Sequence, residues 1–281
     1  MGKPIMVMGT ASGVGKSTVV LILCRLLTKM GYKVAPFKAQ NITDQTFTID
    51  DGNKIANSSR IAAIACQKSP QTDMGPILLE PDIANGVNIY ASGKLIESSR
   101  DIPSCTFEEL FKVAFDAYER LLSQNDFVII EGAGSPVELN LLDQDIVNLN
   151  FALRAKAPIL LVSDIIRGGI YAAVYGTLAL VPEVAKPLFK GIVVNKFMGD
   201  VDLFEDGRAL LAQVAKLPVI GVLPHTVVNI EEEDCFTDEG AKPPAATFVG
   251  RSDQEILESI DQLCVVMQKH LDMDEILSLM R

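Results

Sequence analysis

The run of ten residues GTASGVGKST, from Gly9 to Thr18, constrains the fold of this chain more than any other feature. It ends in Gly15-Lys16-Ser17, as the phosphate-loop pattern G-x-x-x-x-G-K-[ST] does, with Gly9 one residue further from Gly15 than the first glycine of the pattern. The apolar stretch PIMVM (residues 4–8) before it is typical of a buried strand. The helical apolar pattern of residues 17–30 after it stops at Gly31, a typical helix C-cap. This strand–loop–helix context argues against a chance match and predicts binding of a nucleoside triphosphate.

The chemistry expected of the loop follows from its residue types. Backbone N–H groups of a glycine-rich turn and of a helix N-terminus face phosphate oxygens. Lys16 would neutralise the β- and γ-phosphates, and the Ser17 hydroxyl would be a ligand of Mg²⁺. The nucleotide-binding residues predicted here are Gly9, Thr10, Ser12, Gly13, Val14, Gly15, Lys16, Ser17 and Thr18.

Composition narrows the class of protein. The 281 residues are 48% hydrophobic, enough for one large or two small domains with an ample core. The net charge of −11 and the absence of a Lys/Arg cluster weigh against nucleic acid as the main partner. The first apolar run is only a strand long, and no stretch of about 18 uncharged apolar residues could span a bilayer. We therefore expect a cytoplasmic protein without a membrane partner.

Cysteine and histidine usage gives no sign of a metal centre. The five cysteines contain no C-x-x-C pair, which favours reduced thiols over zinc or disulfides. His225 and His270 are the only histidines, so no Ser–His–Asp or Cys–His arrangement is expected.

Apolar runs recur along the chain with helical segments between them. They are rich in Val and Ile and lack polar alternation, as strands buried on both faces of a parallel sheet do. The runs are residues 33–37, 127–130, 159–163, 191–194 and 218–223. The predicted fold class is α/β, with a doubly wound, mostly parallel sheet of the phosphate-loop NTPase type.

Two helix N-termini and the boundaries of the parts of the chain can also be predicted from the sequence. Capping boxes at Thr106-x-x-Glu109 and Ser252-x-x-Glu255 predict helices after each. The second helix carries an apolar stripe that would pack on the body or bind a partner, formed by Ile256, Ile260, Leu263 and Met267. The expected parts are residues 1–228 with an insertion at about 40–103 that could cover a ligand, an acidic linker at 229–250, and C-terminal helices at 251–281.

A second chemical constellation follows the third core strand, at Glu131 in EGAGSP. A carboxylate at the carboxyl end of a strand beside the phosphate loop can hold Mg²⁺ or its water, although an acidic turn would look the same. Asp164 takes the matching place after the next strand, as a metal ligand, substrate ligand or helix cap. Lys38 ends the second strand, where a solvated strand end is the alternative. Together with Lys16, this set suits phosphoryl transfer to a carboxylate, with Lys16, Lys38 and Glu131 as catalytic residues.

Several segments now point to one family. They are GTASGVGKST, APFKAQN (35–41), DMGPILLEP (73–81), EGAGSPVELNL (131–141), DIVN (145–148), RGG (167–169), GTLAL (176–180) and NKFMGD (195–200). In this order the chain resembles, over about residues 1–225, the ATP-binding synthetase domain of cobyric acid synthase, in the dethiobiotin synthetase-like group of amide ligases. The resemblance implies ATP-dependent activation of corrinoid carboxylates as acyl phosphates, which ammonia converts to carboxamides. In the family, a fused glutaminase domain supplies that ammonia from glutamine.

The resemblance also implies further site residues. Asn195 and Lys196 would contact the nucleotide. Asp44 has a metal-binding counterpart in related amide ligases, which makes it a candidate second Mg²⁺ ligand, with a solvated loop acid as the alternative. ATP and Mg²⁺ are thus the expected cofactors.

The chain departs from the family pattern at four positions and at its end. The family usually has DMNP, LKP, an acidic residue before RGG and NKFRGD, where this chain has Gly75, Glu80, Ile166 and Met198. Glu80 and Met198 would remove positive charge facing an anionic substrate, so the substrate stays open between a corrinoid and another small carboxylate. No glutaminase fits after about residue 228, so we expect ammonia from solution or from a separate glutaminase subunit. A homodimer is compatible with the sequence.

Two other functions remain open. One is a ligase of the same chemistry on another substrate, such as the dethiobiotin type. The other is an ATP-driven switch or partitioning ATPase, whose loop K-G-G-x-G-K-[ST] has a signature lysine where Ala11 stands here.

Overall fold

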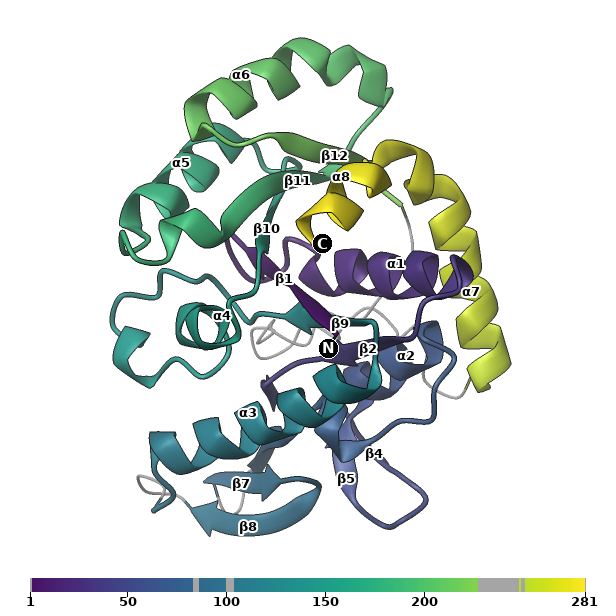
Figure 1. Cartoon of the computed structure of the whole chain (residues 1–281), viewed down its shortest axis with the longest axis vertical. Helices are drawn as coiled ribbons and strands as arrows, with labels where there is room; N and C mark the ends of the chain where they lie inside the picture. The colour runs from purple at the N-terminus through teal and green to yellow at the C-terminus, as the bar shows by residue number, and fades with distance from the viewer. Residues whose placement is uncertain (1, 83–85, 100–103, 227–247, 249–250, 281) are drawn as a thin grey trace.

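The protein is described here from a computed structural model, which covers residues 2–82, 86–99, 104–226, 248 and 251–280 (Figure 1). Its centre is a six-stranded sheet in the order β12-β11-β10-β1-β9-β2, in which all neighbours are parallel. The strands are β1 (Lys3–Gly9), β2 (Val34–Phe37), β9 (Phe127–Glu131), β10 (Ile159–Asp164), β11 (Phe189–Phe197) and β12 (Val219–Pro224). Each coincides with an apolar run of the sequence, which confirms the predicted parallel sheet.

Helices cover both faces of this sheet. They are α1 (Lys16–Lys29), α2 (Asn57–Ala65), α3 (Phe107–Gln124), α4 (Leu149–Ala155), α5 (Ile170–Leu180), α6 (Glu205–Ala215), α7 (Asp253–Met267) and α8 (Met273–Leu279). Short 3₁₀ turns lie at η1 (Thr72–Met74), η2 (Leu142–Gln144), η3 (Lys186–Leu188), η4 (Val201–Phe204) and η5 (Gln268–His270).

The alternation of side chains along a strand divides the core in two. On β1, Ile5 and Val7 pack with α1, α2, α7 and α8, whereas Met6 and Met8 pack with α3, α4, α5 and α6. Both faces of β1 are therefore buried, which explains why its sequence shows no polar alternation. The doubly wound class is confirmed.

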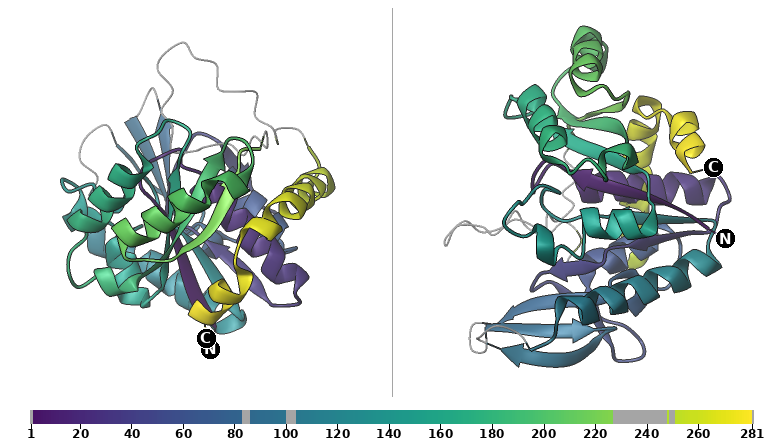
Figure 2. Two further views of the ribbon diagram at one scale, coloured as in Figure 1. Left: turned by 90° about the horizontal axis from the view of Figure 1, so that it is seen from above. Right: turned by 60° about the vertical axis from the view of Figure 1, so that its left-hand side comes forward.

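The insertion between β2 and β9 forms its own small sheets at one end of the molecule (Figure 2). A four-stranded sheet has the order β3-β6-β7-β8, and β4 pairs with β5. These strands are β3 (Gln40–Ile42), β4 (Thr46–Thr48), β5 (Lys54–Ala56), β6 (Ile77–Asp82), β7 (Gly86–Ala91) and β8 (Lys94–Ser99). Ser92 and Gly93 join β7 to β8 in a two-residue hairpin turn, with φ of 48° and 79°. Because β3 starts two residues after Lys38, the insertion grows directly out of the predicted site.

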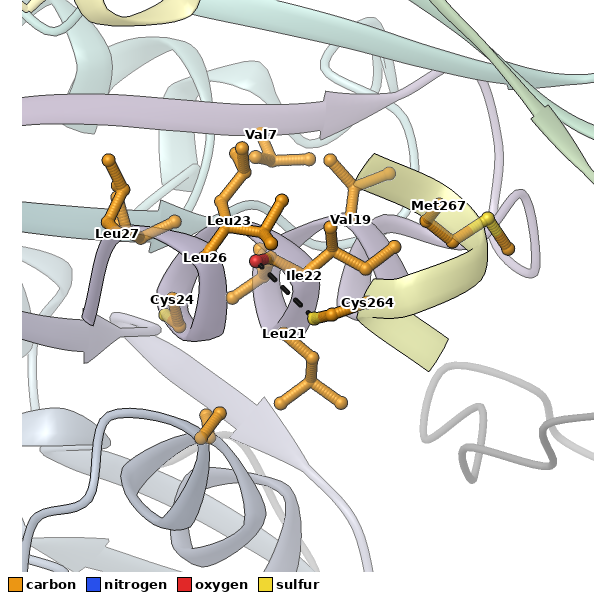
Figure 3. Close-up of a cluster of buried hydrophobic side chains, with 14 of the residues drawn as sticks. Val7, Val19, Leu21, Ile22, Leu23, Cys24, Leu26, Leu27, Cys264 and Met267 are labelled. Carbon is orange, nitrogen blue, oxygen red and sulfur yellow. Dashed lines mark hydrogen bonds between the residues drawn. The ribbon is translucent and has the colours of Figure 1, made fainter. Parts of the chain in front are cut away.

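The C-terminal helices pack on the body of the protein. The stripe Ile256, Ile260, Leu263 and Met267 is buried in the core that contains α1. Figure 3 shows Cys264 of α7 beside Ile22 of α1, with 4.0 Å between the thiol sulfur and the Ile22 carbonyl oxygen. Both capping boxes are present, at Thr106 and at Ser252. The predicted acidic linker, residues 229–250, lies outside the described residues except for Phe248.

None of the helices described here is long and apolar enough to cross a membrane.

Candidate functional site

The candidate site lies at the carboxyl end of β1, in the middle of the sheet. The chain leaves β1 through the phosphate loop and α1. The neighbours of β1 are β9 on one side and β10 on the other. In open α/β sheets, ligands bind outside the carboxyl ends of the strands where the strand order changes direction.

Glycines at two positions of the loop are required by the backbone. Gly13 and Gly15 have φ of 73° and 94°, in the left-handed region that side chains disfavour. A Cβ on Gly15 would also lie 2.0 Å from the Asn195 amide nitrogen. The loop is tied to β10, because the Thr10 backbone N–H donates to the Val162 carbonyl at 2.9 Å.

Asn195 and Lys196, at the end of β11, donate hydrogen bonds to backbone carbonyls of the phosphate loop. The buried Asn195 side-chain amide donates to the Val14 carbonyl at 2.9 Å. The Lys196 ammonium donates to the Gly13 carbonyl. The structure thus brings both predicted residues to the loop, in contact with its backbone, and their contact with a nucleotide stays a prediction.

Lys16 joins the phosphate loop to the loop that follows β9. Its side chain is buried, and its ammonium donates to the Ala11 carbonyl at 3.2 Å and to the Gly134 carbonyl at 3.1 Å. The lysine ammonium therefore lies between these two loops.

Glu131 contacts two other predicted site residues, Ser17 and Lys38. Its Oε1 oxygen accepts hydrogen bonds from the Ser17 hydroxyl at 2.7 Å and from the Lys38 ammonium at 3.3 Å. Glu131 is 7% exposed and Lys38 6%. Strand register explains why Lys38 and Glu131 are close. The residues just before them, Phe37 of β2 and Ile130 of β9, lie opposite each other in the sheet. Burying such a pair is costly, so its presence at the sheet edge favours a functional role over a solvated strand end or an acidic turn.

The Ser17 hydroxyl and the Glu131 carboxylate are oxygen ligands of the kind that Mg²⁺ prefers. Among the described residues, no three His, Cys, Asp or Glu side chains gather as a metal-binding group. Asp44 is exposed in the bend between β3 and β4, and Asp164 is half-buried at the end of β10. The roles of both in holding a metal stay predictions.

Asn148 is a site residue that the sequence reasoning did not select. Its side-chain amide makes two hydrogen bonds with the backbone of Ala133, within EGAGSP. Asp145 accepts hydrogen bonds from the backbone N–H groups of Val147 and Asn148 at 3.0 and 2.7 Å. Burial raises the pKa of Asp145 above its usual value, although these N–H groups oppose the rise. The only signal in the sequence was DIVN as a segment of the family resemblance.

Glu80 does not stand as an isolated negative charge. The Lys54 ammonium donates to its two carboxylate oxygens at 2.8 and 3.0 Å, and the Tyr90 hydroxyl at 3.0 Å. Burial raises the pKa of Glu80, but these hydrogen bonds outweigh it and hold the pKa below its usual value. Glu80 therefore carries its negative charge in an ion pair with Lys54.

Ile166 and Met198, the two apolar departures, are exposed by 45% and 65% in the segments that follow β10 and β11. They add apolar surface to the edge of the sheet at which the phosphate loop lies.

Residues 5–234 match the family model described as CobQ/CobB/MinD/ParA nucleotide binding domain. The chain belongs to this family. It is 41% identical over 243 residues to a cobyric acid synthase of Lachnoclostridium phytofermentans, covering 85% of this chain and 47% of that protein. It is 43% identical over 237 residues to a cobyric acid synthase of Parabacteroides distasonis, covering 83% and 48%.

The chain thus spans about half the length of the curated relatives that it matches. Its backbone is also similar to the MinD cell division protein of Aquifex aeolicus, with a TM-score of 0.47 and 14% identity, covering 93% of this chain and 96% of that one. Family membership and the phosphate loop together make this chain a nucleotide-binding domain.

Proposed function

We propose that this protein is an ATP-dependent amide ligase. It would transfer the γ-phosphoryl group of ATP to a substrate carboxylate, and ammonia would convert the resulting acyl phosphate to a carboxamide. The observation that carries the proposal is the meeting of Lys16, Ser17, Lys38 and Glu131 at the carboxyl edge of one sheet.

The residues at the site are of the types that would bind the phosphates of ATP and Mg²⁺. The turn from Gly13 to Gly15 and the first turn of α1 offer backbone N–H groups to a phosphate chain. Ser17 and Glu131 would be the protein's oxygen ligands for Mg²⁺, which when bound offsets charge on the phosphates. Lys16 would lie against the β- and γ-phosphates.

Lys38 is the residue that favours a carboxylate as the acceptor. Two anions, ATP and a carboxylate, must approach each other, and a buried ammonium beside Glu131 lowers that repulsion. In the first step a carboxylate oxygen attacks the γ-phosphorus, and ADP leaves. In the second step the nitrogen of ammonia attacks the acyl carbon, phosphate leaves, and the nitrogen loses a proton.

The relatives support a corrinoid as the first substrate to test, because those that match the chain are cobyric acid synthases. We propose ammonia as the nitrogen donor that reacts at this site, supplied by a glutaminase part or taken from solution. The side chains of Ile166 and Met198 are exposed and apolar, which is a reason to test other carboxylates as substrates as well. A homodimer stays a prediction.

The proposal is tested by incubating the purified protein with MgATP and a panel of carboxylates, corrinoid carboxylates first, with ammonium or glutamine as the nitrogen donor. We expect a carboxamide by mass and one ADP per amide when ammonium is supplied. The Lys16→Ala variant should keep its fold by far-UV circular dichroism and lose turnover, since it lacks the charge on the β- and γ-phosphates.

A different result would favour the switch class of ATPase. That result is ATP turnover stimulated by a protein or membrane partner, with no covalent product from any carboxylate in the panel. Full activity of the Lys16→Ala variant would contradict the phosphate-loop assignment itself.

A further inference from the structure

One buried side chain satisfies the backbone of the loop that follows β9. The Asn148 side-chain oxygen accepts from the Ala133 N–H at 3.2 Å, and its side-chain nitrogen donates to the Ala133 carbonyl at 2.7 Å. Asn148 is 6% exposed, so water cannot readily replace the amide. A backbone N–H or C=O group that loses its partner where water has poor access is costly to leave unpaired. Asn148 therefore fixes the conformation of this residue from both its donor and its acceptor side.

The neighbouring glycine shows how closely the amide and the loop fit. A Cβ on Gly132 would lie 2.4 Å from the Asn148 side-chain oxygen. On its other side, the Gly132 N–H donates to the Val7 carbonyl of β1 at 2.9 Å. The loop thus lies between β1 and Asn148. Gly132 is needed because a side chain there would collide with the Asn148 amide.

The residues on either side of this anchored pair make the contacts of the site. Glu131, just before it, accepts from the Ser17 hydroxyl, and the Gly134 carbonyl, just after it, accepts from the Lys16 ammonium. Only Gly132 and Ala133 separate these two contacts. A change in the backbone at Ala133 must therefore move one or both of them.

Asn148 is itself held in place. Its backbone N–H donates to the Asp145 carboxylate at 2.7 Å, and it is the N-cap residue of α4. Phe151 of α4 is fully buried in the core. A rigid helix thus supports the amide, which is the arrangement that keeps a catalytic group in place.

We propose that Asn148 is a positioning residue for phosphoryl transfer. It acts through Ala133 to keep Glu131 and the Gly134 carbonyl aligned with Ser17 and Lys16. The kinetic test rests on the proposed reaction, but the positioning concerns the nucleotide half of the site, so hydrogen exchange can test it without the carboxylate.

The test compares Asn148→Ala with Asn150→Ala. Asn150 lies two residues further on, in the first turn of α4, and its side-chain amide also donates to a backbone carbonyl, that of Leu142 in η2 at 3.0 Å. It thus controls for a general weakening of α4. Because a misplacement of about 1 Å can cost about a hundredfold in rate, we expect kcat for ATP turnover to fall about ten- to a hundredfold in Asn148→Ala. KM for ATP should change less than about threefold in Asn148→Ala, and neither constant should change more than about twofold in Asn150→Ala, since the phosphate loop is intact in both.

Hydrogen exchange of the Ala133 amide gives a readout that needs no turnover. Its protection with bound MgATP should be lost in Asn148→Ala and kept in Asn150→Ala, because only the first change removes its acceptor. An Asn148→Asp variant keeps an acceptor for the N–H but places a carboxylate oxygen against the Ala133 carbonyl. We expect it to restore less than half of the lost kcat.

Two results would overturn the positioning role. One is an equal fall in kcat in both alanine variants, in proportion to their loss of melting temperature. The other is unchanged protection of the Ala133 amide in Asn148→Ala. If the wild-type protein forms no amide but Asn148→Ala alone loses this protection, the positioning role holds and the proposed ligase function fails.

Discussion

At the scale of single residues, one carboxylate oxygen serves two neighbours. Glu131 Oε1 is shared by the Ser17 hydroxyl and the Lys38 ammonium. Lys16 and Ser17 could be predicted because their spacing within a phosphate loop is fixed by the chemistry of phosphate binding. Lys38 and Glu131 could be predicted because strand ends share one edge of a parallel sheet. Asn148 could not, because an amide that bonds to a loop fifteen positions away leaves no pattern in the sequence.

Glu131→Gln tests the role of the carboxylate at this scale. A neutral amide is a poorer ligand for a hard cation, so the Mg²⁺ concentration for half-maximal ATP turnover should rise at least about tenfold. The kcat should fall more than the affinity for ATP, because the charge acts mainly on the transferring phosphoryl group.

The measurement is a Mg²⁺ titration of ATP turnover, with Glu119→Gln on the exposed side of α3 as the matched control. The role assigned to Glu131 is wrong if the titration curves of both variants overlay that of the wild type.

At the scale of elements, α7 is joined by hydrogen bonds to α1, the helix that begins at the phosphate loop. Asp261 of α7 accepts two hydrogen bonds from the Arg25 guanidinium of α1, at 2.9 and 2.8 Å, and one from Lys29 at 3.1 Å. The periodic stripe on α7 predicted a buried face, and the structure confirms it. The surface that receives it could not be predicted, because Arg25 and Asp261 are 236 positions apart and helix periodicity does not identify a partner.

The Arg25–Asp261 pair predicts a pH dependence of stability. Hydrogen bonds from Arg25 hold the pKa of Asp261 below its usual value of 3.8, against a smaller opposing effect of burial. The carboxylate therefore stabilises the folded state fully above that usual value, and the contribution is lost as the pH falls through the lowered pKa. Asp261→Asn should cost about 2 kcal/mol of unfolding free energy near pH 7, because it leaves Arg25 without its anion.

Thermal unfolding of the wild type and Asp261→Asn between pH 3 and pH 7 would measure this difference. It should be constant at neutral pH and shrink below about pH 4. Asp274→Asn, an exposed acid in the first turn of α8, is the control and should show a much smaller difference. A difference that stays the same down to pH 3, or grows there, would contradict the assignment.

At the scale of the whole molecule, one parallel sheet carries the candidate site and a separate small sheet lies beside it (Figure 1). The six main strands could be predicted, because burial on both faces leaves unbroken apolar runs. Their order could not, because no periodicity indicates that β9 lies between β1 and β2. The insertion was expected, but its parallel pairing of β3 with β6 was not, since a three-residue strand is too short to show a pattern.

In the proposed reaction the substrate carboxylate is activated as an acyl phosphate. Transfer of ¹⁸O can be followed with a carboxylate substrate labelled at both oxygens, MgATP and ammonium. If a carboxylate oxygen attacks the γ-phosphorus of ATP, that oxygen leaves with phosphate when ammonia forms the amide. Mass spectrometry should then find one ¹⁸O in the inorganic phosphate for each carboxamide formed, and none in the nucleotide. Carboxamide formed with the label in AMP, or with no label in phosphate, would contradict the claim.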